Sequence, residues 1–209
     1  AEASFAGQQA SFLNIREDKN LLLAVKRCWA SLFTARAIYY RIQNHYDHMK
    51  VYLAAVVQKM VNSKKSGVMF TMNPTTNNKK EIVIEGGFGL GEAIVSGAIS
   101  PNLYIVDKNS LKIKTKKVTR QEWLYTRDNL TGSTIKKTLP EYEQTKQVLE
   151  ESEIKALAEH AINIEDHYGK PQDIEWAIEA GKIYIVQSRP ITTTNIIDKS
   201  FSNKKVDFK

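Results

Sequence analysis

Two short runs of alternating residues near the end of the chain constrain the fold more than any other feature. The runs cover residues 173–178 and 183–189, and the connection between them contains Gly181. Alternation of polar and apolar side chains on both sides of a glycine-containing connection predicts a β-hairpin. One face of the hairpin then offers apolar side chains to a hydrophobic core, and the other face carries polar groups.

The length of the loop decides which side chains of the hairpin lie opposite each other. A three-residue loop over residues 180–182, with Gly181 at positive φ, pairs Glu175 with Gln187 and Asp173 with Arg189. A two-residue loop would place Glu175 opposite Val186 and mix polar and apolar side chains on both faces, which burial disfavours. We therefore predict the three-residue loop, with an apolar face made of Ile174, Trp176, Ile178, Tyr184 and Val186.

The polar face has the chemistry of a magnesium-phosphate site. Glu175 beside Gln187 supplies hard oxygen ligands for a partly hydrated Mg²⁺ that shares phosphate oxygens. The planar guanidinium group of Arg189 matches the same phosphates. The alternative is an edge hairpin with a solvated Asp173–Arg189 pair, because one face of an antiparallel sheet is commonly exposed to water.

Composition and charge exclude some classes of protein. The 209 residues are 42% hydrophobic and 25% charged, without a long apolar run or an N-terminal signal pattern, so we expect a cytoplasmic protein with no membrane partner. The net charge of +7 raises the alternative of a basic nucleic-acid-binding module. The basic residues cluster at 108–120 and 136–137 without an aromatic stacking series, so we expect no nucleic-acid partner.

The remaining pattern predicts helices and strands in mixed order. A packing helix is expected over residues 21–43, with Leu22, Val25, Trp29, Leu32 or Phe33, and Ala37 on its buried side, and a second helix over residues 152–168. Strands are expected at residues 51–61, 66–72, 81–85, 103–107 and 111–119, the first two forming a hairpin.

Two further segments contain candidate nucleotide contacts. Residues 58–61, Gln58-Lys59-Met60-Val61, leave a predicted strand and offer backbone groups to a purine while Met60 packs on its face. Gly7 and Ser11 belong to a small, polar loop whose amides and hydroxyl suit a phosphate. The glycine-rich residues 86–91 follow a strand but lack a Walker ending, so we do not place the phosphates there.

Several motifs in a fixed order resemble one known family. They are Glu2–Gln9, Val25–Phe33, Gln58–Val61, Gly67–Thr71, Gly89–Glu92, Asp173–Trp176 and Gln187–Pro190. Together they are similar to the nucleotide-binding domain of the phosphoenolpyruvate synthase and pyruvate phosphate dikinase family, which includes rifampicin phosphotransferases. The resemblance extends from Glu2 to about Thr192 and implies an ATP-grasp fold. We therefore expect an α+β fold, mostly antiparallel sheet with packed helices.

The resemblance also implies roles for individual residues. Glu175 and Gln187 match the family's metal and phosphate ligands, Arg189 its catalytic phosphate-contacting arginine, and Asp173 its supporting acid. Gln58, with the backbone of Lys59, Met60 and Val61, matches the adenine hinge, and Gly7 and Ser11 match a phosphate loop in which threonine is common at the second position. The implied cofactors are ATP and Mg²⁺.

The implied reaction transfers the β-phosphate of ATP to a histidine on a separate domain of the same polypeptide and then to pyruvate. Its products are phosphoenolpyruvate, AMP and phosphate. A pyruvate phosphate dikinase or a rifampicin-type phosphotransferase is the alternative. The family's nucleotide domain begins with roughly a hundred further residues, so we expect residues 1–194 to be its C-terminal portion, residues 195–209 to be a linker, and the chain alone to be inactive.

Overall fold

A six-stranded antiparallel sheet carries most of the described structure. The computed structural model describes residues 9–191. The sheet has the strand order β4-β3-β2-β1-β7-β8, and every neighbouring pair is antiparallel. Its strands are β1 (Lys65–Phe70), β2 (Glu81–Phe88), β3 (Asn102–Asp107), β4 (Ile113–Lys117), β7 (Gln172–Glu179) and β8 (Lys182–Pro190).

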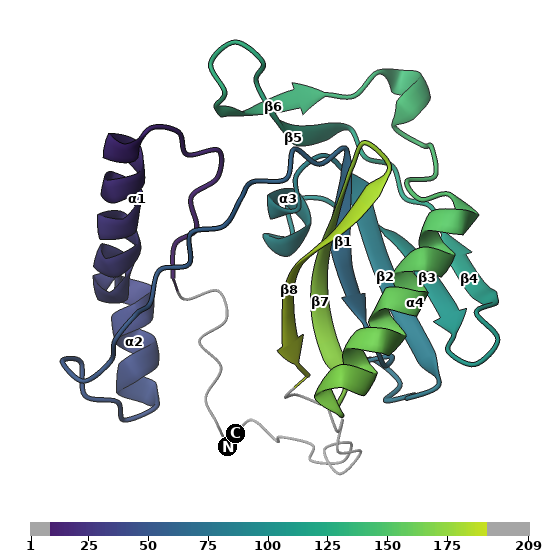
Figure 1. Cartoon of the computed structure of the whole chain (residues 1–209), viewed down its shortest axis with the longest axis horizontal. Helices are drawn as coiled ribbons and strands as arrows, with labels where there is room; N and C mark the ends of the chain where they lie inside the picture. Colours follow the sequence, from purple (N-terminus) through teal and green to yellow (C-terminus); the bar gives the residue numbers. More distant parts are fainter. Residues whose placement is uncertain (1–8, 192–209) are drawn as a thin grey trace, which may run out of the picture.

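Helix α4 (Glu151–Tyr168) covers one face of this sheet (Figure 1). A capping box between Glu150 and Glu153 begins the helix, and Gly169 ends it in the left-handed conformation. Its predicted apolar side is confirmed, since Ile154, Leu157, Ala158 and Ala161 are fully buried. These side chains share one core with Met69, Ile82, Ile84, Tyr104, Val106, Ile174, Trp176 and Ile178 of the sheet. The expected α+β class, with helices packed on an antiparallel sheet, is confirmed.

The short elements lie around the edges of this sheet. They are α3 (Glu92–Val95), η2 (Glu141–Glu143) and a separate hairpin of β5 (Trp123–Arg127) and β6 (Thr134–Thr138). The hairpin lies beyond the ends of β1 and β2 (Figure 1). Of the helices in residues 9–191, only α4 has the length of a membrane span, and its sequence is too polar for one.

The single helix predicted over residues 21–43 is wrong. The structure has α1 (Asp18–Ala30), the 3₁₀ turn η1 (Ser31–Phe33) and α2 (Ala35–Gln43). Thr34 has an extended backbone, and its hydroxyl group accepts a hydrogen bond from the Ala37 amide, so it begins a new helix.

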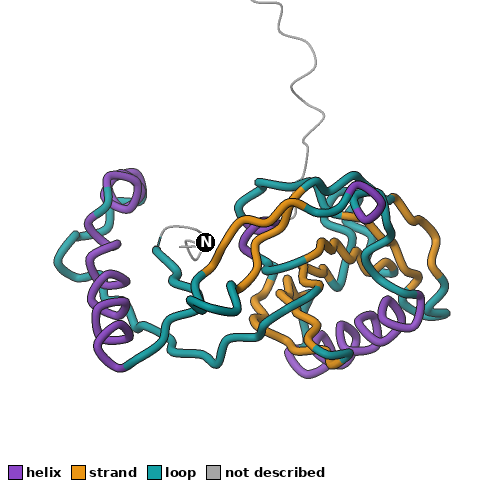
Figure 2. Tube along the Cα trace, turned by 90° about the horizontal axis from the view of Figure 1, so that it is seen from above, coloured by secondary structure: helices purple, strands orange, loops and turns teal. Residues whose placement is uncertain are grey.

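The predicted buried side of this region is confirmed only in part. Leu22 and Trp29 are half exposed or more, whereas Val25 is half-buried and Ala37 is buried. Of the two alternatives Leu32 and Phe33, Leu32 is the buried one. Helices α1 and α2 stand apart from the sheet and are joined to it by loops, so the sheet does not cover their apolar side chains (Figure 2).

The strand predicted over residues 51–61 is wrong as well. These residues pair with no strand in the described part of the chain, and β1 begins only at Lys65. The physical reason is that β2 and β7 already occupy both edges of β1, which leaves no hydrogen-bonding edge for the predicted hairpin.

Candidate functional site

The predicted hairpin is present as β7 and β8, and its two polar pairs are confirmed. Asp173 lies opposite Arg189, and Glu175 lies opposite Gln187. Since side chains two residues apart on a strand share a face, these four polar side chains lie on one side of the hairpin. Ile174, Trp176 and Ile178 point to the other side, into the core beneath α4.

The predicted three-residue loop is wrong. Glu179 pairs with Lys182, so the loop consists of Ala180 and Gly181 alone. Both residues have positive φ, 50° and 78°, as a type I′ turn requires. A β-bulge then shifts the register between Glu175 and Trp176, with Val186 as the extra residue on β8. The bulge restores the pairing of Glu175 with Gln187.

The bulge also corrects the predicted apolar face. Ile183 and Ile185 lie opposite Ile178 and Trp176 and therefore share their face, whereas Tyr184 lies opposite Ala177 on the polar side. Tyr184 and Val186 are thus not the core residues that a three-residue loop implied. Ile183 packs against the core in their place.

Two glycines allow Trp176 to hold β7 on the core. Gly67 lies directly opposite Trp176, and a methyl group there would be 2.6 Å from the indole and 1.9 Å from the Glu85 carbonyl oxygen. A methyl group at Gly86 would be 3.2 Å from the same ring. The indole covers both glycines and is 1% exposed. This packing fixes the strand whose other side carries Asp173 and Glu175.

Arg189 and Asp173 form a charge-assisted pair across the two strands. Arg189 Nε donates to Asp173 Oδ2 at 2.8 Å, and Arg189 Nη2 lies 2.7 Å from the same oxygen. The carboxylate thereby fixes one edge of the guanidinium group. Arg189 remains 45% exposed, so its remaining donors are open to an anion from solvent.

The Glu175 carboxylate is half-buried and has no hydrogen bond or ion pair with any described residue. Burial raises its pKa, with further increases from the charges of Asp173 and Glu92, while Arg189 opposes the change. A half-buried carboxylate without a partner favours a cation. Glu175 and Gln187 therefore fit a magnesium ion whose other ligands are phosphate and water oxygens, although the described residues contain no cluster of three His, Cys, Asp or Glu side chains around a metal position.

Two carboxylates on this side of the sheet were missing from the predicted site. Glu92 is the first residue of α3, and its negative charge contributes to the raised pKa of Glu175. Glu85 lies two strands from Glu175 in the same cross-strand row, with Val68 of β1 between them. Burial also raises the pKa of Glu85. The available signal for Glu85 was a carboxylate at the end of an apolar strand, directly before two glycines. For Glu92 no periodic pattern linked α3 to the hairpin.

The predicted adenine segment lies beside the hairpin. Gln58 Nε2 donates to the carbonyl oxygen of Val186 at 3.2 Å, which joins residues 58–61 to the bulge next to Gln187. Met60 and Val61 are half-buried, and Lys59 is exposed. The structure therefore brings Gln58 and the Glu175–Gln187 pair to the same part of the molecule.

The predicted phosphate loop is placed only in part. Gly7 lies outside the described residues. Ser11 is exposed and has no hydrogen bond to the hairpin among residues 9–191. Its neighbour Ala10 is bonded to the η1 region, because its amide donates to Ser31 Oγ and its carbonyl accepts from Cys28 Sγ. Ser11 therefore belongs to the helical part of the structure.

The basic residues are partly neutralised within the fold. Lys65 pairs with Glu153, Lys108 with Glu165, and Lys114 with both Asp107 and Glu81. The cluster that suggested nucleic-acid binding therefore supplies less free charge than its composition indicates.

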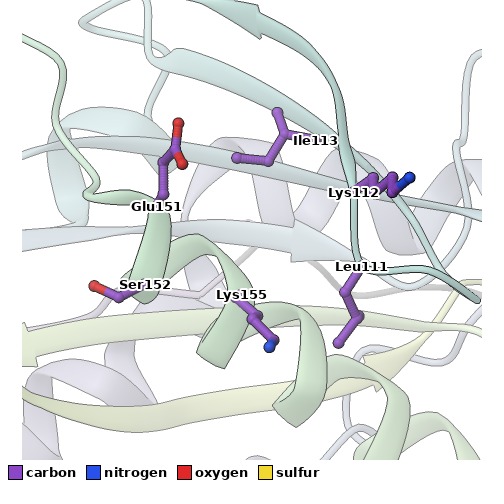
Figure 3. Close-up of a pocket in the computed structure, with 6 residues that line it drawn as sticks. All are labelled: Leu111, Lys112, Ile113, Glu151, Ser152 and Lys155. Carbon is purple, nitrogen blue, oxygen red and sulfur yellow. The ribbon is translucent and has the colours of Figure 1, made fainter.

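A shallow depression on the α4 side of the sheet contains none of the predicted ligands. Its volume is about 550 Å³, and Figure 3 shows its lining of Leu111, Lys112, Ile113, Glu151, Ser152 and Lys155. It lies between the turn before β4 and the first turns of α4, across the sheet from Glu175. None of the residues that line it belongs to the β7–β8 hairpin.

Comparison with known proteins identifies the family of the chain. Residues 1–207 match the family described as pyruvate phosphate dikinase, AMP/ATP-binding domain. The chain belongs to this family. The resemblance expected from the sequence motifs is confirmed.

Several members of the family are close relatives. The chain is 55% identical over 199 residues to the phosphoenolpyruvate synthase of Pyrococcus furiosus, covering 92% of this chain and 24% of that protein. It is 52% identical over 206 residues to a probable phosphoenolpyruvate synthase of Methanocaldococcus jannaschii, covering 99% and 17%. A rifampicin phosphotransferase of Bacillus subtilis is 45% identical over 194 residues, covering 91% and 22%. The chain thus spans about a quarter or less of each relative.

Proposed function

We propose that this chain forms the triphosphate-binding wall of an ATP-binding domain in an enzyme that makes phosphoenolpyruvate from pyruvate. The observation that carries the proposal is the polar face of β7 and β8, where Glu175 pairs with Gln187 and Arg189 is fixed by Asp173. The proposal rests further on the family and on relatives named phosphoenolpyruvate synthase.

Each side chain has a defined task in this proposal. Glu175 and Gln187 hold Mg²⁺, which when bound neutralises charge on the phosphates of ATP. Arg189 donates to the transferring phosphate as its charge develops, and Asp173 positions the guanidinium group for that contact. The remaining contacts are proposed for adenine, at Gln58 and the backbone of Lys59, Met60 and Val61, and for the phosphates, at Gly7 and Ser11.

The proposed reaction divides one ATP between two products and an acceptor. The β-phosphate passes to a histidine on a separate domain of the same polypeptide and then to the pyruvate enol oxygen, while the γ-phosphate is transferred to water and leaves as inorganic phosphate and the remainder of ATP leaves as AMP. A cytoplasmic enzyme of this kind needs no membrane or nucleic-acid partner. The Bacillus relative supports a second candidate in which rifampicin replaces pyruvate as the acceptor.

The proposal is tested by measuring AMP formation from ATP, with pyruvate or rifampicin as the acceptor, in the complete polypeptide that carries this chain. Pyruvate should support AMP formation, and Arg189→Lys should lower kcat by about tenfold or more because lysine lacks the planar fork. Arg120→Lys, at an exposed arginine paired with Glu122, is the matched control. The 209-residue chain alone should form no AMP.

Three results would contradict this assignment. If Arg189→Lys and the parent protein turned over at the same rate, Arg189 would not contact the transferring phosphate. If AMP formed with rifampicin and not with pyruvate, the phosphate acceptor would be rifampicin and not pyruvate. Pyruvate-dependent turnover by the 209-residue chain alone would show that these residues suffice for catalysis.

A further inference from the structure

The β-bulge in β8 decides which of its residues face the candidate site. With the two-residue turn and a regular ladder, Gln187 would lie opposite Ile174 and point into the core. The extra residue Val186 shifts the register, so that Gln187 lies opposite Glu175 on the polar side. Arg189 moves to the polar side in the same way. The proposed metal and phosphate ligands of β8 therefore depend on the bulge.

The bulge has a hydrogen-bonding partner outside the sheet. Strand β8 is the outer strand of the six-stranded sheet, and β7 is its only neighbouring strand among residues 9–191. A bulge interrupts the ladder between two strands and leaves its extra residue unpaired. The Val186 carbonyl oxygen accepts a hydrogen bond at 3.2 Å from Gln58 Nε2. The side chain of Gln58 thus satisfies a backbone group of the extra residue.

This hydrogen bond fixes the segment proposed to bind the base. Residues 51–61 contain no helix or strand, and Gln58 makes the only hydrogen bond that joins them to the rest of the described chain. The next bonds to the sheet follow at Ser63 and Lys64, where β1 is about to begin. Gln58 is therefore the one point at which this segment and the hairpin hold each other.

A second anchor lies on the other side of Gln187. Ser188 Oγ donates to Gln172 Oε1 at 2.9 Å, and Gln172 is fully buried at the start of β7. Gln187 therefore lies between one residue that is held from within the β7–β8 pair and another, Val186, that is held by Gln58. Loss of the Gln58 bond would leave the bulge without its outer anchor.

We propose that Gln58 is a positioning residue that holds the bulge and so keeps Gln187 and Arg189 directed at the phosphates. This role rests on the proposed function, since the two ligands matter only if the polar face binds the triphosphate. It is distinct from a contact between Gln58 and adenine, because it acts on phosphate binding through Val186. Base binding at residues 58–61 and phosphate binding at the hairpin are then coupled.

A ligand without a base separates positioning from base recognition. In the complete polypeptide with Mg²⁺, calorimetry compares inorganic tripolyphosphate with AMP for the parent and for Gln58→Met, which keeps the side-chain length but has no donor. Gln58→Met should weaken tripolyphosphate binding by about threefold or more, as expected when one hydrogen bond is lost. Gln43→Met, at an exposed glutamine that ends α2, is the matched control and should bind both ligands as the parent does.

Hydrogen exchange in the 209-residue chain measures the bulge without any ligand. The amides of residues 184–189 should exchange about threefold faster in Gln58→Met than in the parent chain or in Gln43→Met, while the amides of α4 should not change. Unchanged tripolyphosphate affinity or unchanged exchange in the hairpin would overturn the proposal, and a loss confined to AMP would make Gln58 a base contact only.

Failure of the proposed function would give a different result. If the parent polypeptide bound no tripolyphosphate in the presence of Mg²⁺, the polar face would not be a phosphate site. Faster exchange of residues 184–189 in Gln58→Met would then still show that Gln58 holds the bulge.

Discussion

At the scale of a single residue, the features of Glu175 that suit it to bind a cation also make the folded state less stable. Its carboxylate is half-buried, unpaired and close to the negative charges of Asp173 and Glu92. A cation would relieve this repulsion, but the protein alone must tolerate it. Functional sites commonly retain such unfavourable groups at a cost in stability.

The raised pKa of Glu175 predicts a pH-dependent effect of Glu175→Gln on stability. Because the folded state keeps the proton to a higher pH than the unfolded state, folding becomes less favourable as pH rises from the ordinary value of 4.5 through the raised pKa. Glu175→Gln should therefore raise the Tm at about pH 7.5 in metal-free buffer and leave it nearly unchanged at about pH 4.

The control for this comparison is Glu179→Gln, on the same face of β7 beside the turn. Its Tm should follow that of the parent chain at both pH values. A Glu175→Gln variant that is less stable at the higher pH would show that the carboxylate has a stabilising partner.

At the scale of one element, the β7–β8 hairpin explains how much of the site could be predicted from sequence. The pairing of Glu175 with Gln187 was predicted correctly, because one apolar and one polar face is the only arrangement that burial favours. The loop was wrong because a bulge at Val186 compensates for a shorter turn. Valine fits a regular strand as well as a bulge, so no residue type indicated the extra position.

The same limit applies to residues 51–61 and to Glu92. The β-branched run predicts a strand, but pairing depends on which edges of β1 are free, and this is a property of the whole sheet. The effect of Glu92 in α3 on Glu175 in β7 likewise depends on how the loop after β2 folds back. Local sequence patterns therefore located the hairpin and its polar face but not the neighbouring groups.

The two-residue turn predicts opposite effects for its two positions. Ala180 has a φ of 50°, which is unfavourable for alanine and better tolerated by asparagine. Ala180→Asn should raise the free energy of unfolding by about 0.5–1 kcal/mol. Gly181→Ala, at a φ of 78°, should lower it by about 1 kcal/mol or more. Urea denaturation measures both free energies of unfolding. An Ala180→Asn variant that is no more stable than the parent chain would contradict the two-residue turn.

Packing of the hairpin on the core gives a third prediction. Trp176→Ala should lower the free energy of unfolding by about 3–5 kcal/mol, since the side chain is fully buried. Gly67→Ala should cost about 1–3 kcal/mol because its methyl group collides with the Glu85 carbonyl and the indole. Gly91→Ala is the control, with only ordinary contacts at 3.7 Å. A loss below about 1 kcal/mol for Trp176→Ala in denaturant melts would show that the hairpin is peripheral.

At the scale of the whole molecule, the sheet separates the hydrophobic core from the candidate site. The α4 side holds the hydrophobic core, and the opposite side holds Glu175, Glu85 and the Asp173–Arg189 pair. Gln58 is joined to the β7–β8 hairpin by its hydrogen bond to the Val186 carbonyl. The segment that contains Gln58 also connects the sheet to helices α1 and α2, which stand apart from the sheet (Figure 2). A nucleotide bound between residues 58–61 and the β7–β8 hairpin would therefore contact both the connecting segment and the sheet.

The most direct test of the central claim compares ATP and AMP binding by calorimetry in the complete polypeptide, with Mg²⁺ present. Glu175→Gln should weaken ATP by about tenfold or more and leave AMP within about twofold, because only ATP brings the phosphates that share the metal. Glu179→Gln should leave both affinities unchanged. If Glu175→Gln binds ATP within about twofold of the parent protein, a difference below half a kcal/mol, the polar face of the hairpin is a solvated edge and not a phosphate site.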